Sequence, residues 1–293
     1  MASEHHIENP FEFFLEKLSW TASDVGRAAR LDPARHAAQA VPDVRRIAVR
    51  DLWDALRKGV ADVGATRDDI LFIGVIYPLA GLLLARLAFS YDLLPLVFPL
   101  ASGFALIGPF AAVGLYELSR RREQGLPVTW ADTFGVFRSP ALGSILLLGA
   151  TLLALFVLWL AVAYEIYLAT LGSAPPQSLA GFERSVFQTG GGWTMIAAGI
   201  GVGFLFAVLA FAIGVVSFPL LLDRDVGVVK AIGASLRAVA ANAGVMAVWG
   251  AIVAGALVLG SLPALIGLVF VMPVLGHATW HLYRKLIGPP DVA

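Results

Sequence analysis

The chain contains 293 residues, of which 58% are hydrophobic and only 14% are charged, and its mean hydropathy is +0.80. Soluble proteins are about half apolar and a quarter charged, so this composition indicates an integral membrane protein. The formal net charge of zero gives no support to a nucleic-acid partner. Because the chain has no cysteine, disulfides, iron–sulfur clusters, thiolate metal sites and cysteine nucleophiles are excluded.

Residues 1–50 form a hydrophilic N-terminal arm with one predicted amphipathic helix near residues 10–20. Asn9 suits the N-cap of that helix, and Pro10 suits its first position. Four apolar residues then recur on one helix face, namely Phe11, Phe14, Leu15 and Leu18. So short a helix is marginal alone in water. We therefore expect it to dock on the membrane or in the groove of a partner protein.

Six apolar stretches follow in a membrane domain of residues 51–288, and a tail of residues 289–293 ends the chain. A helix needs about 20 residues to cross a bilayer core of about 30 Å. We predict spans near residues 70–89, 93–118, 141–168, 193–222, 243–260 and 263–284. Only a turn around Ser261 and Pro263 separates the last two, so a single kinked helix is the alternative there.

The distribution of positive charge predicts the orientation. If the N-terminus lies inside, nearly all lysines and arginines fall on the cytoplasmic side, with Arg86 and Arg184 as the exceptions. The positive-inside rule favours this arrangement, so both termini are expected in the cytoplasm.

The six predicted spans form three hairpins, and each hairpin follows a cytoplasmic amphipathic segment. These segments are DLWDALRKGVADV (51–63), TWADTFGVFRS (129–139) and VGVVKAIGASLRAVA (226–240). An amphipathic helix of this kind lies in the membrane interface. The hairpins also end alike, in LYELSRRRE, FPLLLDRD and WHLYRK, and aligning their arginines places Glu117 at the position of His281. The sequence therefore predicts an all-α polytopic protein built as a threefold repeat.

Glycines in the fourth span predict close helix packing. Gly199 and Gly203 are four residues apart, which is the small-xxx-small pattern that lets two membrane helices approach each other.

Two histidines of the last span make the strongest candidate for a metal site. His277 and His281 share one helix face and could bind a divalent metal if a third ligand, for which the repeat suggests Glu117, lay nearby. The alternative is an interfacial belt in which Trp280 and Tyr283 accompany histidines that only hydrogen-bond to neighbours. Two histidines on one helix turn cannot be the two axial ligands of a haem, so a bis-histidine haem is excluded. No cofactor is predicted, and the HExxH motif of zinc proteases is absent from the sequence.

Several blocks resemble one family. YPLAGLLL (77–84), GFALIGPFAAVGLYELSRRRE (103–123), SFPLLLDRDVG (217–227) and GHATWHLYR (276–284) are similar to the bacterial integral membrane family catalogued as domain of unknown function 2189. The resemblance runs from about Arg50 to Lys285. It implies a multi-pass protein of the bacterial inner membrane without an established activity. Some relatives carry a label that links them to cytochrome c oxidase subunit I, although this chain lacks the histidines of an oxidase core.

The pattern as a whole predicts a protein that is not an enzyme, because no catalytic constellation is present. We expect an accessory subunit or assembly factor of a larger membrane complex, with a respiratory oxidase as one candidate. Its expected partners are the lipid bilayer and either another membrane protein or a second copy of the chain. A transporter of small molecules or lipids is the alternative, since repeats are common in transporters. A metal-binding membrane protein that uses His277 and His281 is a minor alternative.

Overall fold

The computed structural model is all-helical over the residues that it describes, which confirms the predicted fold class. Within that part of the chain there is no strand, only one isolated bridge between Val44 and Ile287. The described residues are 42–65, 91–101, 108, 112–174, 176–224, 226–262 and 266–288. Four predicted features lie outside them: the N-terminal helix with Phe11, Phe14, Leu15 and Leu18, the span near 70–89, part of the span near 93–118, and the tail 289–293.

The elements that position the rest of the molecule are ten helices of the described chain. In order they are α3 (Val49–Ala65), the 3-10 helix η1 (Tyr91–Leu96), α6 (Val113–Glu123), the 3-10 helix η2 (Trp130–Arg138), α7 (Leu142–Leu171), α8 (Leu179–Gln188), α9 (Gly190–Asp223), α10 (Val228–Ala241), α11 (Ala243–Ser261) and α12 (Leu268–Leu286). Three of these, α7, α9 and α11, are long and apolar enough to cross a membrane. A count of six spans is not established by the described residues.

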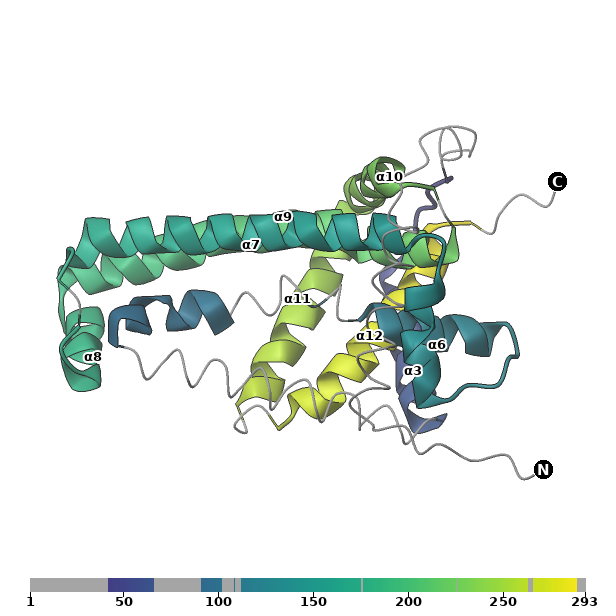
Figure 1. Ribbon diagram of the computed structural model, residues 1–293, viewed down its shortest axis with the longest axis horizontal. Coiled ribbons are helices and arrows are strands. Elements are labelled where there is room, and N and C mark those ends of the chain that lie inside the picture. Colours follow the sequence, from purple (N-terminus) through teal and green to yellow (C-terminus); the bar gives the residue numbers. More distant parts are fainter. Residues whose placement is uncertain are drawn as a thin grey trace, which may run out of the picture.

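Helices α7 and α9 form a long antiparallel hairpin, and α8 lies at its tip (Figure 1). With 30 and 34 residues, these helices are roughly 45 and 51 Å long, well beyond the hydrocarbon core of a bilayer. The Trp159 ring of α7 packs against Phe206, and a Cβ atom added at Gly203 would lie 3.0 Å from that ring. Gly203 therefore serves packing within the chain, whereas a Cβ at Gly199 would have no heavy atom of the described residues within 4 Å.

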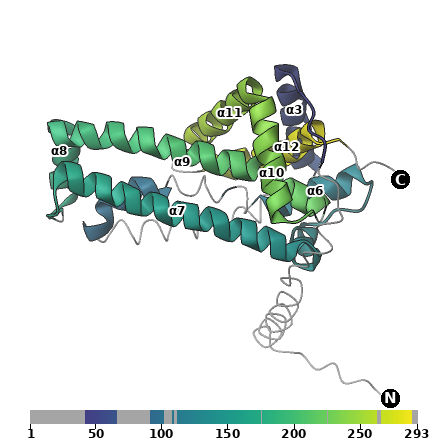
Figure 2. The ribbon, with the colours of Figure 1, turned by 90° about the horizontal axis from the view of Figure 1, so that it is seen from above.

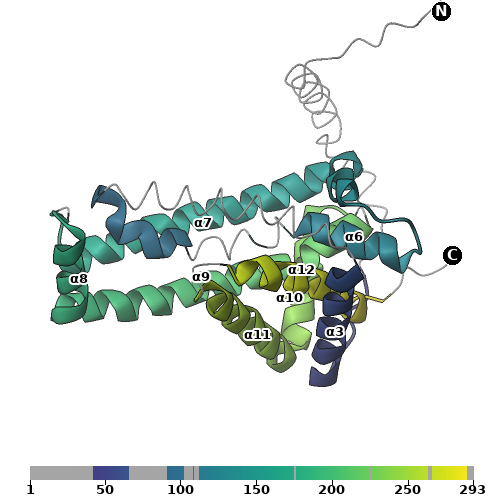
Figure 3. The same cartoon turned by 90° about the horizontal axis from the view of Figure 1, so that it is seen from below.

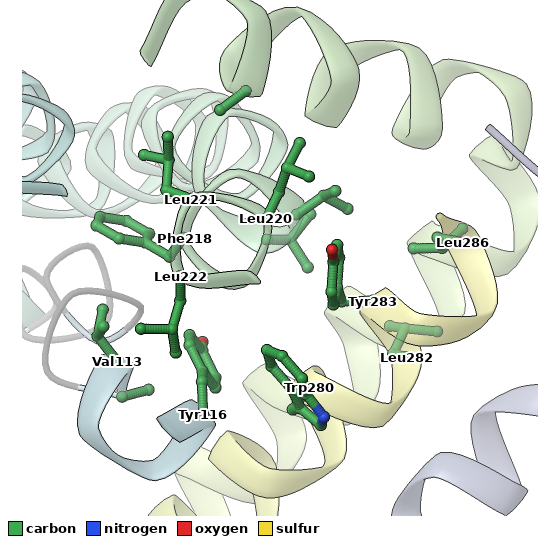
Figure 4. Close-up of a cluster of buried hydrophobic side chains, with 14 of the residues drawn as sticks. Val113, Tyr116, Phe218, Leu220, Leu221, Leu222, Trp280, Leu282, Tyr283 and Leu286 are labelled. Carbon is green, nitrogen blue, oxygen red and sulfur yellow. The ribbon is translucent and has the colours of Figure 1, made fainter. Parts of the chain in front are cut away.

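The end of the molecule opposite α8 is here named the base, and it consists of α3, α6, α10 and the C-terminal parts of α9 and α12. Helices α3 and α10 run across the direction of the α7–α9 hairpin (Figures 2 and 3). Apolar side chains from three helices meet inside the base (Figure 4). They come from α6 (Val113, Tyr116), α9 (Phe218, Leu220, Leu221, Leu222) and α12 (Trp280, Leu282, Tyr283, Leu286). This cluster joins the ends of helices that are distant in sequence.

Helix α10 is attached to α9 through a serine hydroxyl. Ser235 donates a hydrogen bond to the Ala212 carbonyl at 2.7 Å and accepts one from the Val216 amide at 3.2 Å. These two backbone groups would pair with each other in a regular helix. Pro219 lies one turn further on and cannot donate to the Val215 carbonyl. The hydrogen bonds of Ser235 therefore attach α10 to α9 next to the point where Pro219 already removes one backbone hydrogen bond of α9.

Helix α3 packs directly on α12 because one of its residues has no side chain. A Cβ atom at Gly59 would lie 2.7 Å from both the Ala278 amide nitrogen and the Val274 carbonyl oxygen. Only glycine allows this backbone approach. The contact sets the distance between the two helices.

Replacing Gly59 by alanine should therefore destabilise the base. We expect Gly59→Ala to lower the free energy of unfolding by about 1–3 kcal/mol, because overpacking forces the backbones of α3 and α12 apart. Gly64→Ala on the same helix is the matched control, since no heavy atom lies within 4 Å of an added Cβ there. That control should be neutral or slightly stabilising through helix propensity. Thermal unfolding in detergent measures both, and equal midpoints for the two variants would contradict the packing.

Candidate functional site

The candidate site is a polar cluster in the base where α3, α6 and α12 meet. His277 and His281 lie one turn apart on α12, as their spacing predicts, and both approach the carboxylate of Asp62 in the last turns of α3. Asp62 Oδ2 lies 2.9 Å from His281 Nε2 and 3.7 Å from His277 Nδ1. Ser119 of α6 completes the cluster, with its Oγ 2.5 Å from Asp62 Oδ2 and 2.7 Å from His277 Nδ1.

The hydrogen-bond partners assign the protons. Ser119 has one hydroxyl proton, and it donates that proton to the Asp62 carboxylate, which can only accept. His277 Nδ1 must therefore carry a proton and donate to Ser119 Oγ. By the same reasoning, His281 Nε2 donates to Asp62. Two imidazole N–H groups thus point at one carboxylate, one directly and one through a serine.

A positive side chain also contacts Asp62. Arg122 Nη1 donates to the Asp62 backbone carbonyl at 2.7 Å and lies 3.5 Å from Asp62 Oδ1. Burial raises the pKa of the Asp62 carboxyl, but hydrogen bonds from His281 and Ser119 and the charge of nearby histidines outweigh it and lower the pKa to about 2. The carboxylate is therefore ionised across the physiological range and stabilised by its neighbours.

Glu117, the predicted third ligand, does not face this cluster. Arg120 binds it with two hydrogen bonds of 2.8 and 2.9 Å, and it lies beside Gly135 of η2. Residues two apart on a helix point about 200° apart, so Glu117 and Ser119 cannot both face α12. The carboxylate next to the histidines is Asp62.

The arrangement of protons bears on metal binding. The ring nitrogens of His277 and His281 nearest Asp62 both donate hydrogen bonds, whereas a metal ligand needs a free lone pair. Within the described residues, no group of three or more His, Asp or Glu side chains is placed to hold a metal ion. A divalent metal at the histidine pair stays a prediction, and it would displace two protons only if it were bound by the two nitrogens nearest Asp62.

The cluster contains the residue types of a serine hydrolase but not their geometry. In a triad the serine donates to histidine, and histidine donates to the acid. Here Ser119 donates to the carboxylate itself. Ser119 and His277 are both fully buried, so a substrate cannot reach the hydroxyl. What the arrangement can do is hold three helices together.

A second polar cluster joins α6, α9 and α12 beside the first. Tyr283 donates to Asp223 at 2.6 Å, and Arg284 contacts both Asp223 and Glu123. Trp280 also donates its indole N–H to Glu123 at 3.1 Å. The C-terminal part of α12 is thus bonded to both α6 and α9.

Sequence reasoning found the histidines but missed Asp62 and Ser119. Asp62 belongs to an amphipathic segment that the sequence predicts to lie in the membrane interface, and Ser119 is a single hydroxyl among arginines. The available signal was the helical phase of α3, because Asp51 and Asp62 are eleven residues apart and share one face. An acidic face beside a basic helix end predicts such pairing.

The fold and composition define an integral membrane protein, and comparison with known families agrees. Residues 97–223 match the model of a family described as a predicted integral membrane protein, DUF2189. This match extends through α9 and agrees with the resemblance that the motifs of the sequence indicate. Of the four residues in the Asp62 cluster, only Ser119 lies within the match. No curated protein and no solved structure matches the chain.

The lowered pKa of Asp62 gives a test by pH. The folded-state pKa of about 2 lies below the ordinary value of 3.8, so the stability that Asp62 contributes is present above pH 4 and is lost as the pH falls toward 2. At neutral pH, Asp62→Asn should lower the free energy of unfolding by at most about 2 kcal/mol, reduced by solvent screening. The difference from the natural chain should shrink between pH 4 and pH 2.

Thermal unfolding in an acid-stable detergent measures this difference. Asp43→Asn is the control, because Asp43 is exposed. A destabilisation by Asp62→Asn that stays constant down to pH 2 would show that the carboxylate charge is not its source.

Proposed function

We propose that this protein is a non-catalytic subunit or assembly factor of a larger complex in the bacterial inner membrane. The observation that carries the proposal is the use of the polar side chains in the base. His277, His281, Asp62 and Ser119 bind each other, and the cluster around Asp223 likewise joins helices. Such groups support architecture rather than turnover, since their hydrogen-bonding capacity is directed at other helices.

The orientation belongs to the same proposal. Cations gather in the base, where α6 alone carries Arg120, Arg121 and Arg122 in its last turn. At the opposite end, α8 carries Arg184. By the positive-inside rule the base faces the cytoplasm and α8 faces the outer side.

The surface available to a partner in the membrane is the outer side of α7, α9 and α11. Exposed large side chains recur along α9, including Ile200, Phe204 and Leu205. In α7 and α11 most of the apolar window is likewise not buried within the chain. Lipid tails or the helices of another membrane protein suit such a surface equally, because both are apolar. Gly199, which has open space beside it, gives one point at which a partner helix could approach closely.

Purification of the tagged full-length chain from its native membrane in mild detergent tests the subunit role. We expect one or a few membrane proteins to co-purify in fixed ratio, identified by mass spectrometry. If the co-purified proteins are subunits of a respiratory oxidase, mass spectrometry identifies that oxidase as the complex to which the protein belongs.

Two variants sharpen this experiment. A chain without residues 1–41 should lose or weaken the association if the N-terminal helix docks on the partner. Gly199→Leu should weaken it if α9 contacts the partner, with Gly64→Leu in the base as the control. Recovery of the full-length chain alone, at native expression and in several mild detergents, would contradict the proposal.

A further inference from the structure

The three carboxylates of α3 lie on one side of the helix, beside Lys58, which pairs with Asp54 at 3.3 Å, and away from Arg50 and Arg57. Asp51 and Asp54 both contact Lys285 of α12, at 3.2 and 2.8 Å. Asp62, on the same side of the helix, binds His281. All three carboxylates of α3 are therefore paired with side chains of α12.

The outer face of α3 presents apolar side chains beside cations. Val49, Trp53 and Val60 form one exposed stripe, and the Trp53 side chain is 57% exposed. Arg50 and Arg57, which are seven residues apart, are exposed along the edge of this stripe. Tryptophan and arginine on one exposed helix face are typical of the membrane interface, where the ring meets the acyl boundary and the guanidinium meets phosphate.

Helix α10 has a similar outer face, with exposed apolar residues next to a basic residue. In register, Val49-Arg50 and Leu56-Arg57 of α3 correspond to Val229-Lys230 and Leu236-Arg237 of α10, each pair 180 positions apart. Val229 is 80% exposed, and Leu236 and Arg237 are exposed as well. Helix α10 contains no acidic residue. Its buried face consists of small residues that pack on α9, which leaves Val229, Leu236 and Arg237 on the outside.

The segment η2 has a shorter version of the same pattern. Phe137 and Arg138 are both exposed, in the place of Leu56-Arg57 and Leu236-Arg237. The acid of this segment, Asp132, is bound by Arg121 at 3.1 Å and by Thr129. The segments α3, η2 and α10 therefore each present an apolar residue next to an arginine, while the carboxylates of α3 and η2 are paired with other side chains.

We propose that the outer faces of α3, η2 and α10 bind the phosphate headgroups of anionic phospholipids in the leaflet next to the base. Charge complementarity selects the lipid class, because these faces expose arginines and their acids are paired elsewhere. The position of α3 and α10 across the α7–α9 hairpin is the one that lies along a membrane surface when the hairpin crosses the bilayer (Figure 3). The proposal does not depend on whether the protein is a subunit of a complex.

Lipid selectivity of the full-length protein tests this inference. The chain is reconstituted in phosphatidylcholine vesicles that contain a trace of spin-labelled phosphatidylglycerol or spin-labelled phosphatidylcholine. Electron paramagnetic resonance then gives the fraction of each lipid that the protein immobilises. We expect the natural chain to prefer phosphatidylglycerol, and salt to reduce that preference. Arg57→Gln and Arg237→Gln should each reduce it by up to about fivefold.

Arg184→Gln is the matched control, because it removes an equally exposed arginine from α8 at the opposite end of the hairpin. It should reduce the preference much less than either base variant. Unchanged thermal unfolding of all three variants separates lost lipid contacts from lost folding. The inference is overturned if the natural chain shows no preference, if the double variant Arg57→Gln/Arg237→Gln keeps it, or if Arg184→Gln reduces it as much as Arg57→Gln.

Discussion

A carboxylate that is mostly buried must be matched by hydrogen-bond donors or positive charge, and Asp62 meets this requirement with residues from two other helices. His277 and His281 come from α12, and Ser119 and Arg122 come from α6. Because Asp62 itself belongs to α3, its charge fixes three segments that lie far apart in the sequence. The close backbone contact at Gly59 places α3 on α12 in the register that this requires. The base depends on both features.

The same requirement explains the distribution of the other polar groups. Asp223 and Glu123 gather Tyr283, Arg284 and Trp280, so α12 is bonded to α6 and α9 at the same end of the molecule. Because the acids are paired with other side chains, arginines and large apolar residues are left on the outer faces of α3 and α10. The long hairpin is apolar along its length, which suits the bilayer and a membrane partner. The architecture thus joins a base whose helices are held together by polar side chains to the apolar α7–α9 hairpin.

Much of this fold could be predicted from periodicity and length. The apolar runs that become α7, α9 and α11 are long, and the amphipathic segments at 51–63 and 226–240 correspond to α3 and α10. The helical phase of His277 and His281 also gave their shared face. Asp62, the acid next to the two histidines, could not be identified by aligning hairpin ends. That alignment compares positions within a repeat and says nothing about which helices are in contact. Asp62 lies in a segment that precedes the first hairpin, and only the packing of α3 on α12 brings it to the histidines. The segment 129–139 also forms a 3-10 helix, which its amphipathic pattern did not distinguish from an α-helix.

The most direct test of the account is a double-mutant cycle on Asp62 and His281. The free energies of unfolding of the natural chain, Asp62→Asn, His281→Gln and the double variant are measured in one detergent at neutral pH. If the two side chains act through their contact, the double variant is less destabilised than the sum of the single variants, with a coupling of about 0.5–3 kcal/mol. Strictly additive effects would mean that Asp62 and His281 stabilise the base independently, and the polar cluster would not be what joins α3 to α12.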